Sequence, residues 1–342
     1  MGKYYSTFIT GLQDLVKTGL EENLNDIKID LILDGLIVYQ TKSSKEKIKD
    51  IRFINNSFIL LCLLKQKGKF TLKEFINQVI RGPGFISNIS GELFKNIHSF
   101  RVIISDENEL KHIDNILLKD SENIFSKKYR LKIDRGNPDV EIWFMTRSEG
   151  YGFVGLRITK KPNYEKTLHK GEIRPELANL MCLVADLKYT DTVLDPFAGY
   201  GSIPKECERS YKVKKIIAGE INRKIFHILC SRINRINITT GRWDALNLTS
   251  LTDKSVDKII TDPPWGIYEI LKQDITAFYH MMITEFIRIL KPKGLIVVLT
   301  SQKEVIEKVL KYFPSLTLLR KFDTLVSGKK AAIYKIQLKS YY

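Results

Sequence analysis

Residues 193–204 read Val193-Leu194-Asp195-Pro196-Phe197-Ala198-Gly199-Tyr200-Gly201-Ser202-Ile203-Pro204. This pattern predicts an apolar strand, a glycine-rich turn and a helix whose first turn holds Pro204, where the fixed φ of proline is favourable. The glycines allow a ligand to approach the backbone closely, and the start of the helix offers free N–H groups. The segment therefore predicts an α/β domain that binds a cofactor at this turn.

Apolar strands and amphipathic helices alternate regularly from residue 191 onward, which is typical of a parallel sheet with crossover helices. We expect strands at 192–195, 215–220, 258–262 and 295–299, and helices at 177–187, 223–236 and 275–290. The last two strands, 316–322 and 331–338, are joined by Ser327-Gly328. Because this connection is too short for a helix, the final pair must be antiparallel.

The first 160 residues follow a different pattern, which predicts an α+β assembly of two small units. We expect strands at 4–10, 28–33, 36–40, 58–64, 100–105, 140–146 and 152–158, with helices near 12–20, at 72–80 and at 109–118. The Asp34-Gly35 dipeptide predicts a hairpin, and residues 82–84, Gly-Pro-Gly, interrupt the chain.

Composition restricts the class of protein. The 342 residues are 44% hydrophobic and 27% charged, which predicts a globular chain of two or three domains and excludes a disordered one. The net charge of +16 favours polyanionic partners such as nucleic acid or an anionic membrane surface. Four dispersed cysteines suggest neither a zinc site nor a disulfide scaffold, and no run is long enough to span a membrane. We expect a soluble, cytoplasmic protein, with a monomer favoured.

The glycine turn leaves two types of cofactor open. A dinucleotide site would have a third glycine where Pro204 stands, so a methyl donor is favoured over a dinucleotide. Glu220 ends the next strand and can chelate both ribose hydroxyls of an adenosine cofactor. The alternative is that Glu220 is an ordinary solvated acid at a strand end.

A second motif, Thr261-Asp262-Pro263-Pro264-Trp265-Gly266, directly follows a predicted strand of the same sheet. The exocyclic amine of a base is a poor nucleophile because its lone pair is delocalised into the ring. The carboxylate of Asp262 and a backbone carbonyl held outward by Pro263-Pro264 can accept hydrogen bonds from such an amine, and Trp265 can stack on the base. The alternative is a Pro-Pro loop with a packed tryptophan.

Together the two motifs resemble the S-adenosylmethionine-dependent amino-methyltransferases, whose hallmark is a D/N-P-P-Y/F/W tetrapeptide. Within this class the chain is similar to the THUMP-domain RNA guanine-N2 methyltransferases. Three further stretches support the resemblance: residues 8–15 (Phe-Ile-Thr-Gly-Leu-Gln-Asp-Leu), 137–142 (Asn-Pro-Asp-Val-Glu-Ile) and 168–171 (Leu-His-Lys-Gly). Two departures, Tyr200 for a small residue and Ser202 for Thr, make the cofactor turn bulkier than in the family.

The resemblance implies a mostly parallel seven-stranded Rossmann-like methyltransferase domain at 161–342, ending in an antiparallel hairpin. It also implies a ferredoxin-like domain at 1–65 and a THUMP RNA-binding domain at 66–160. The activity implied is methylation of an exocyclic amine in structured RNA, with tRNA as substrate and guanine-N2 as the acceptor atom.

Site roles also follow from the resemblance. Asp195, Gly199 and Gly201 would hold the methionine end of S-adenosylmethionine, and Glu220 would bind its ribose. Phe197 would also contact the cofactor. Asp244 would accept from the adenine amine, although an Asp that caps the next turn fits the sequence as well. The tetrapeptide Asp262-Pro263-Pro264-Trp265 would be catalytic.

Several interpretations stay open. Arg174-Pro175-Glu176 either closes over the carboxylate of the donor or simply begins a helix. Basic and aromatic residues at 127–130 and 160–164 could follow an RNA backbone, or could be a solvated face. The five histidines lack metal-ligand spacing, and no metal is expected. Methylation of adenine-N6 or of another amine, and a non-catalytic RNA-binding or chaperone role, are the competing functions.

Overall fold

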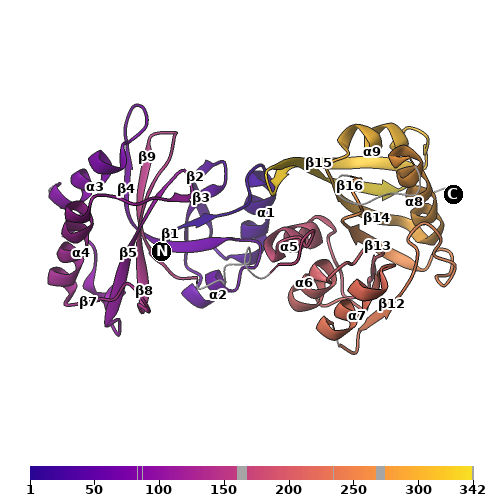
Figure 1. The fold of residues 1–342 in the computed structure, drawn as a ribbon, viewed down its shortest axis with the longest axis horizontal. Helices are drawn as coiled ribbons and strands as arrows, with labels where there is room; N and C mark the ends of the chain where they lie inside the picture. The colour runs from indigo at the N-terminus through magenta and orange to yellow at the C-terminus, as the bar shows by residue number, and fades with distance from the viewer. Residues whose placement is uncertain (83, 87, 160–167, 234, 267–273, 341–342) are drawn as a thin grey trace.

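The computed structural model describes residues 1–342 except 83, 87, 160–167, 234, 267–273 and 341–342. Figure 1 shows two halves side by side along the longest axis, each built on its own sheet. The helices α1 and α5 lie where the two halves meet (Figure 1). No helix among the described residues is long and apolar enough to cross a membrane.

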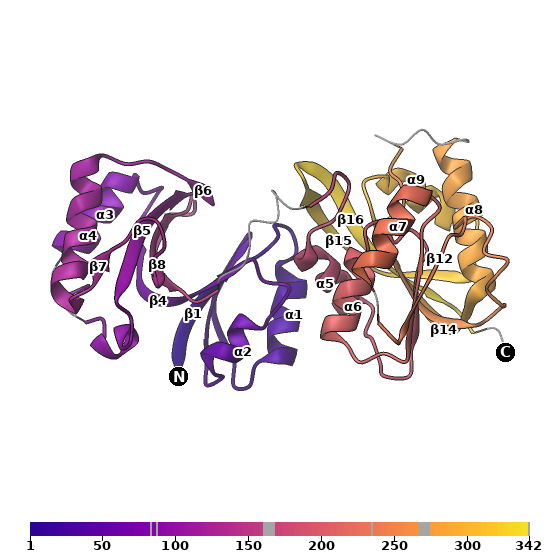
Figure 2. The ribbon, with the colours of Figure 1, turned by 60° about the horizontal axis from the view of Figure 1, so that its bottom comes forward.

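The first half contains a nine-stranded mixed sheet in the order β2-β3-β1-β4-β9-β8-β5-β6, with β7 paired to β5. The strands are β1 (Gly2–Thr7), β2 (Lys28–Leu33), β3 (Leu36–Thr41), β4 (Asn56–Lys65), β5 (Ser99–Asp106), β6 (Glu109–Leu110), β7 (Lys132–Ile133), β8 (Val140–Thr146) and β9 (Tyr151–Arg157). The helices are α1 (Gln13–Asn23), α2 (Lys45–Lys49), α3 (Leu72–Arg81) and α4 (Asn115–Tyr129), with a 3-10 turn η1 (Gly91–Phe94). Figure 2 shows α3 and α4 packed on the strands furthest from the second half.

Strand β4 lies in the middle of this sheet. It pairs with β1 on one side and with β9 on the other, so the strands that the sequence assigned to two small units form one continuous sheet. Tyr5 of β1 stacks on Phe58 of β4 with ring centroids 4.5 Å apart. A Cβ on Gly155 of β9 would lie 2.4 Å from the ring of Tyr5, so glycine leaves the space that this tyrosine fills. The face of the sheet opposite the helices is therefore also a packed core.

The second half is a seven-stranded sheet in the order β12-β11-β10-β13-β14-β16-β15. Its strands are β10 (Thr192–Asp195), β11 (Lys215–Gly219), β12 (Ile238–Gly241), β13 (Val256–Thr261), β14 (Leu290–Thr300), β15 (Leu316–Val326) and β16 (Lys329–Leu338). Its helices are α5 (Pro175–Val184), α6 (Ser202–Ser210), α7 (Arg223–Arg232), α8 (Ile275–Ile289) and α9 (Lys303–Leu310). The first five strands run parallel, whereas β16 is antiparallel to both β14 and β15. The predicted Rossmann-like sheet with a closing hairpin is confirmed.

Alternate residues of these strands face opposite helix layers. Val193 and Ile216 belong to the cluster that includes α5 and α6, and their neighbours Leu194 and Ile217 belong to the cluster around α8 and α9. A parallel sheet buried on both faces requires strands that are apolar at successive positions, as these are.

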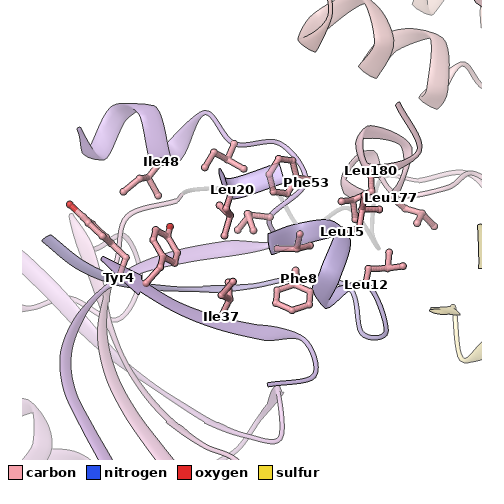
Figure 3. Close-up of a cluster of buried hydrophobic side chains, with 14 of the residues drawn as sticks. Tyr4, Phe8, Leu12, Leu15, Leu20, Ile37, Ile48, Phe53, Leu177 and Leu180 are labelled. Atoms are coloured by element: carbon pink, nitrogen blue, oxygen red, sulfur yellow. The ribbon is translucent and has the colours of Figure 1, made fainter. Parts of the chain in front are cut away.

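The apolar core continues from the first half into the second. Figure 3 shows Leu12, which directly precedes α1, and Leu15 of α1 close to Leu177 and Leu180 of α5, in one buried cluster. A polar contact lies nearby, where the hydroxyl of Thr324 in β15 donates to the carbonyl of Thr10 at 2.9 Å. The two halves are therefore packed together rather than joined by a linker alone.

Two local predictions were wrong. The helix expected at 109–118 is the short strand β6 followed by α4, which begins at Asn115 because the carboxylate of Asp114 accepts from the N–H of Ile116 at 2.6 Å. The helix expected to reach Ile236 ends at Arg232, and Ile236 is fully exposed. The short helices α2 and α9 were not expected from the sequence.

Candidate active site

The carboxyl ends of four neighbouring parallel strands bring the predicted site residues to one edge of the second sheet. Asp195 ends β10, Glu220 follows β11 and Asp262 follows β13, and β10 pairs with both of the other strands. Ligands of open α/β sheets bind outside the carboxyl ends of the strands. The fold therefore assembles at one place residues that are far apart in the sequence.

The turn after β10 requires glycine at two positions because of its backbone conformation and, at Gly201, also because of close packing. Gly199 and Gly201 both have positive φ, at 53° and 88°. A Cβ on Gly201 would also lie 2.4 Å from a methyl carbon of Ile233, so α7 packs directly against this turn. The N–H of Ala198 donates to the carbonyl of Gly219 at 2.8 Å, which ties the turn to β11. The result is a tight backbone cradle beside the start of α6.

Asp195 is 2% exposed, and its side chain is held in place from two sides. One carboxylate oxygen accepts from the hydroxyl of Thr261 at 2.8 Å and from the N–H of Phe197 at 3.2 Å. Burial raises the pKa of Asp195 to about 7, more than these hydrogen bonds lower it, and the negative charge of Glu220 adds to the increase.

Glu220 lies at the tip of the adjacent strand. Burial raises the pKa of this carboxyl, while backbone N–H groups, including that of Asn222 at 2.7 Å, act in the opposite direction. Two interacting carboxyls, both with raised pKa, lie beside a glycine cradle. This arrangement would be stabilised by a ligand that carries positive charge and hydroxyl donors.

Asp244 follows β12, the strand on the other side of β11, and is exposed. Its carboxylate accepts from the N–H of Leu246 at 3.0 Å, which is the turn-capping geometry that the sequence left open. The neighbouring Trp243 packs so closely that a Cβ on Gly241 would lie 2.0 Å from its ring. The cap leaves the second oxygen of Asp244 as a possible acceptor for a ligand.

The Asp-Pro-Pro-Trp segment has neither helical nor strand conformation. The indole N–H of Trp265 donates to a carboxylate oxygen of Asp262 at 2.9 Å, so both ends of the segment face one another. Pro263 is buried, whereas Pro264 is half-buried. Trp265 is half-buried against the core, as the packed-tryptophan alternative expects, and its remaining exposed surface leaves the predicted stacking role open.

The segment before α5 packs onto the glycine turn. The rings of His169 and Tyr200 stack nearly parallel with centroids 4.1 Å apart. Glu172 accepts from the hydroxyl of Ser202 at 3.0 Å and forms an ion pair with Arg232 at 2.8 Å. Tyr200 and Ser202, the two positions of the turn that depart from the pattern named in the sequence resemblance, both contact this segment.

The other open interpretations have mixed outcomes. Pro175 stands in the first turn of α5, and the Arg174 side chain forms an ion pair with Glu176 at 3.5 Å, which is consistent with a helix start. Tyr129 is half-buried, and its ring stacks on Phe94 with centroids 4.1 Å apart, so that face of the ring is not available to a base. The basic stretch at 160–164 lies outside the described residues.

Two further residues at this edge of the sheet, Thr261 and Gln302, were given no role from the sequence. Thr261 is buried and donates to Asp195, and Gln302 donates to the backbone carbonyl of Trp265 at 2.6 Å. Gln302 follows the strand next to β13, and this position could have indicated it. Among the described residues, no group of three or more His, Cys, Asp or Glu side chains could hold a metal ion.

A family model described as UPF0020, RMKL-like, methyltransferase domain matches residues 162–240 and 232–322. Curated relatives are similar at low identity. A tRNA (guanine(6)-N2)-methyltransferase of Thermus thermophilus is 26% identical over 54% of this chain and 56% of its own length. A bovine tRNA (guanine(6)-N(2))-methyltransferase, THUMP3, is 27% identical over 78% of this chain and 58% of its own length. The chain thus spans about half the length of these relatives.

The fold itself is shared over the whole chain. The crystal structure of TrmN from Thermus thermophilus superposes with a TM-score of 0.77 and 19% identity, covering 99% of this chain and 100% of that one. A putative methyltransferase complexed with SAH superposes with a TM-score of 0.71 and 12% identity, covering 100% and 98%. These matches establish that both halves are arranged as in known structures.

Proposed function

Because the second half matches a methyltransferase-domain model and the whole chain shares the TrmN fold, we propose that this protein transfers a methyl group from S-adenosylmethionine to an exocyclic amine of RNA. The acceptor proposed is guanine-N2 in tRNA. The observation that carries the proposal is the meeting of the glycine turn and the Asp262-Pro263-Pro264-Trp265 segment at adjacent strand ends.

The residues at the turn fit the proposed cofactor. Positive φ at Gly199 and Gly201 and the close packing of Gly201 form a cradle that a Cβ would fill. Asp195, Phe197 and the two glycines would hold the methionine end, and Glu220 the ribose hydroxyls. Asp244 would accept from the adenine amine. When bound, the cofactor supplies a methyl group already activated by a positively charged sulfur.

The Asp-Pro-Pro-Trp segment would act on the acceptor base. The amine of guanine donates to the carboxylate of Asp262 and to a backbone carbonyl of the segment, which localises its lone pair for attack. Trp265 stacks on the extruded base, a contact worth roughly 1–3 kcal/mol in comparable systems. Since the donor is already activated, correct positioning is the main contribution of these residues.

We propose that the first half binds the RNA, with a ferredoxin-like unit at 1–65 and a THUMP unit at 66–160. The net charge of +16 supports a polyanionic substrate. Relatives named as tRNA guanine-N2 methyltransferases come from bacteria, archaea and mammals, and one mouse relative is named a U6 snRNA (guanine-N(2))-methyltransferase. The four free cysteines support a reducing compartment, and we propose the cytoplasm.

The test is incubation of the chain with tritiated S-adenosylmethionine and total tRNA from cells that lack this gene. Mass spectrometry of the digested nucleosides should find N2-methylguanosine, mapped to one nucleotide. Asp262→Ala should lower the transfer rate at least about 100-fold while its affinity for S-adenosylhomocysteine in calorimetry stays unchanged.

Three outcomes would overturn the proposal. Methylated adenine, or label in protein, would show a different acceptor amine. Binding of RNA without binding of the cofactor would favour a non-catalytic RNA-binding or chaperone role. Full activity of Asp262→Ala would remove the catalytic assignment.

A further inference from the structure

The Asp-Pro-Pro-Trp segment leaves β13 without regular structure, so its geometry depends on side-chain contacts. At its far end, the side-chain amide of Gln302 donates to the backbone carbonyl of Trp265 at 2.6 Å. Gln302 is half-buried and stands between β14 and α9, next to the end of β13. A residue that follows β14 therefore fixes the backbone of the Asp-Pro-Pro-Trp segment by a hydrogen bond.

Gln302 is itself anchored to the core. Its backbone N–H donates to the hydroxyl of Thr300 at 2.9 Å, and that hydroxyl is hydrogen-bonded to the hydroxyl of Tyr279 at 2.6 Å. Thr300 and Tyr279 are both fully buried. Because a buried hydrogen-bonded network is rigid, the backbone of Gln302 is held in place, and its side-chain amide reaches the loop from this anchored position.

The contact reaches the reacting centre through Trp265. The carbonyl of this residue is bound by Gln302, and its indole N–H donates to Asp262 at 2.9 Å. A shift of the carbonyl therefore turns the indole and changes the direction in which the Asp262 carboxylate points. The residues proposed to bind the cofactor lie at or after the ends of β10, β11 and β12. A shift of the segment after β13 would therefore affect them much less than it affects Asp262.

We propose that Gln302 is a positioning residue for the methyl transfer. It fixes the backbone carbonyl of Trp265, and through the indole it orients Asp262 toward the acceptor amine. This inference rests on the proposed function. Since misplacement of a reacting group by about 1 Å can cost about 100-fold in rate, loss of this contact should lower kcat far more than it changes cofactor affinity.

The test compares three variants of the full chain with the wild type. Gln302→Ala removes the donor, and Gln302→Glu keeps the size of the side chain but at pH 8 presents an acceptor to the Trp265 carbonyl. Gln337→Ala is the matched control, because Gln337 donates to another backbone carbonyl of the same domain, that of Lys293, at 3.3 Å. The measurements are kcat and KM with the total tRNA described above, calorimetry with S-adenosylhomocysteine, and thermal unfolding.

We expect Gln302→Ala and Gln302→Glu to lower kcat about 10- to 100-fold, with cofactor affinity within about twofold of the wild type. Gln337→Ala should match the wild type in all measurements. Wild-type kcat in Gln302→Glu would overturn the inference even if Gln302→Ala did not fold. Equal losses of kcat and cofactor affinity would do the same, because they indicate general disruption of the domain. A wild type without methyl transfer would instead refute the proposed function.

Discussion

Burial of the Asp195 carboxyl group lowers the free energy of unfolding by an amount that depends on pH. Its pKa is raised by burial from 3.8 to about 7, so in the folded chain it stays protonated where the unfolded chain has lost the proton. Between about pH 4 and pH 7 the folded state then binds more protons than the unfolded state. The contribution of Asp195 to the free energy of unfolding therefore falls across that range as the pH rises. Above about pH 7 its contribution is constant.

Asp195→Asn should remove this pH dependence. Asparagine keeps an oxygen that can accept from Thr261 and Phe197 but has no charge to bury. At about pH 8 the cofactor-free variant should be more stable than the wild type by on the order of a few kcal/mol, and at about pH 5 the gain should be smaller. Urea unfolding at both pH values measures the difference. An equal gain at both values would contradict the assignment, and the exposed Asp253→Asn serves as control.

Glu220 and Asp244 are proposed to bind different parts of the cofactor. Glu220→Gln should weaken S-adenosylhomocysteine binding about 10- to 100-fold, since it loses charged hydrogen bonds to the ribose.

Asp244→Asn keeps the oxygen that caps the turn at Leu246 but replaces the second acceptor with an amide donor. It should weaken binding about fivefold, as measured by calorimetry. If Asp244→Asn bound like the wild type, Asp244 would be a turn cap only.

At the scale of elements, α6 connects the cofactor turn with the first half of the molecule. Its N-terminus follows Gly201, and one turn further along Glu206 is 2% exposed and forms an ion pair with Arg52 from the first half. The amide of Asn179 in α5 also donates to Glu206, at 3.4 Å. This helix therefore contacts the first half of the molecule directly and also begins at the glycine turn.

Arg52→Ala should destabilise the chain by about 3–5 kcal/mol, because it leaves the buried Glu206 without its cation. Arg235→Ala is the matched control. It removes the partner of Glu208 on the same helix, but that pair is exposed and 3.8 Å apart, so the loss should be below about 1 kcal/mol. Urea unfolding measures both changes. Similar small losses in both variants would show that the contact between the halves is held by the apolar cluster alone.

At the scale of the whole molecule, the net charge of +16 is the feature that any RNA substrate would meet. Both halves contribute to it, and they are packed into one body by α1 and α5 (Figure 3). Electrostatic contacts with phosphates release counterions, so binding of RNA weakens steeply as salt rises.

Binding of total tRNA should therefore fall at least about tenfold between 50 and 200 mM salt, whereas binding of S-adenosylhomocysteine should change by less than about twofold. Filter binding and calorimetry over the same salt series measure the two affinities. Similar salt slopes for both ligands would argue against a phosphate-binding surface. A tRNA affinity independent of salt would argue against RNA as the polyanion.

The sequence alone predicted the features that depend on residues close together in the chain. The strand, turn and helix at 193–204, the parallel sheet and its antiparallel end follow from local periodicity and from glycine and proline, and the structure confirms them. The start of α4 was missed because one side chain, that of Asp114, decided it. The Asp262 segment was found because its four residues are contiguous.

Contacts between distant residues were decided only by the tertiary structure. Three contacts join positions far apart in the chain: the pairing of β4 with both β1 and β9, the hydrogen bond from Gln302 to Trp265, and the ion pair of Arg52 with Glu206. No local pattern specifies such a pair, because its free energy depends on burial and on which strand ends become neighbours. The residues proposed for the site could be chosen from the sequence, and they remain a proposal, but the contacts that orient them follow from how the whole chain packs.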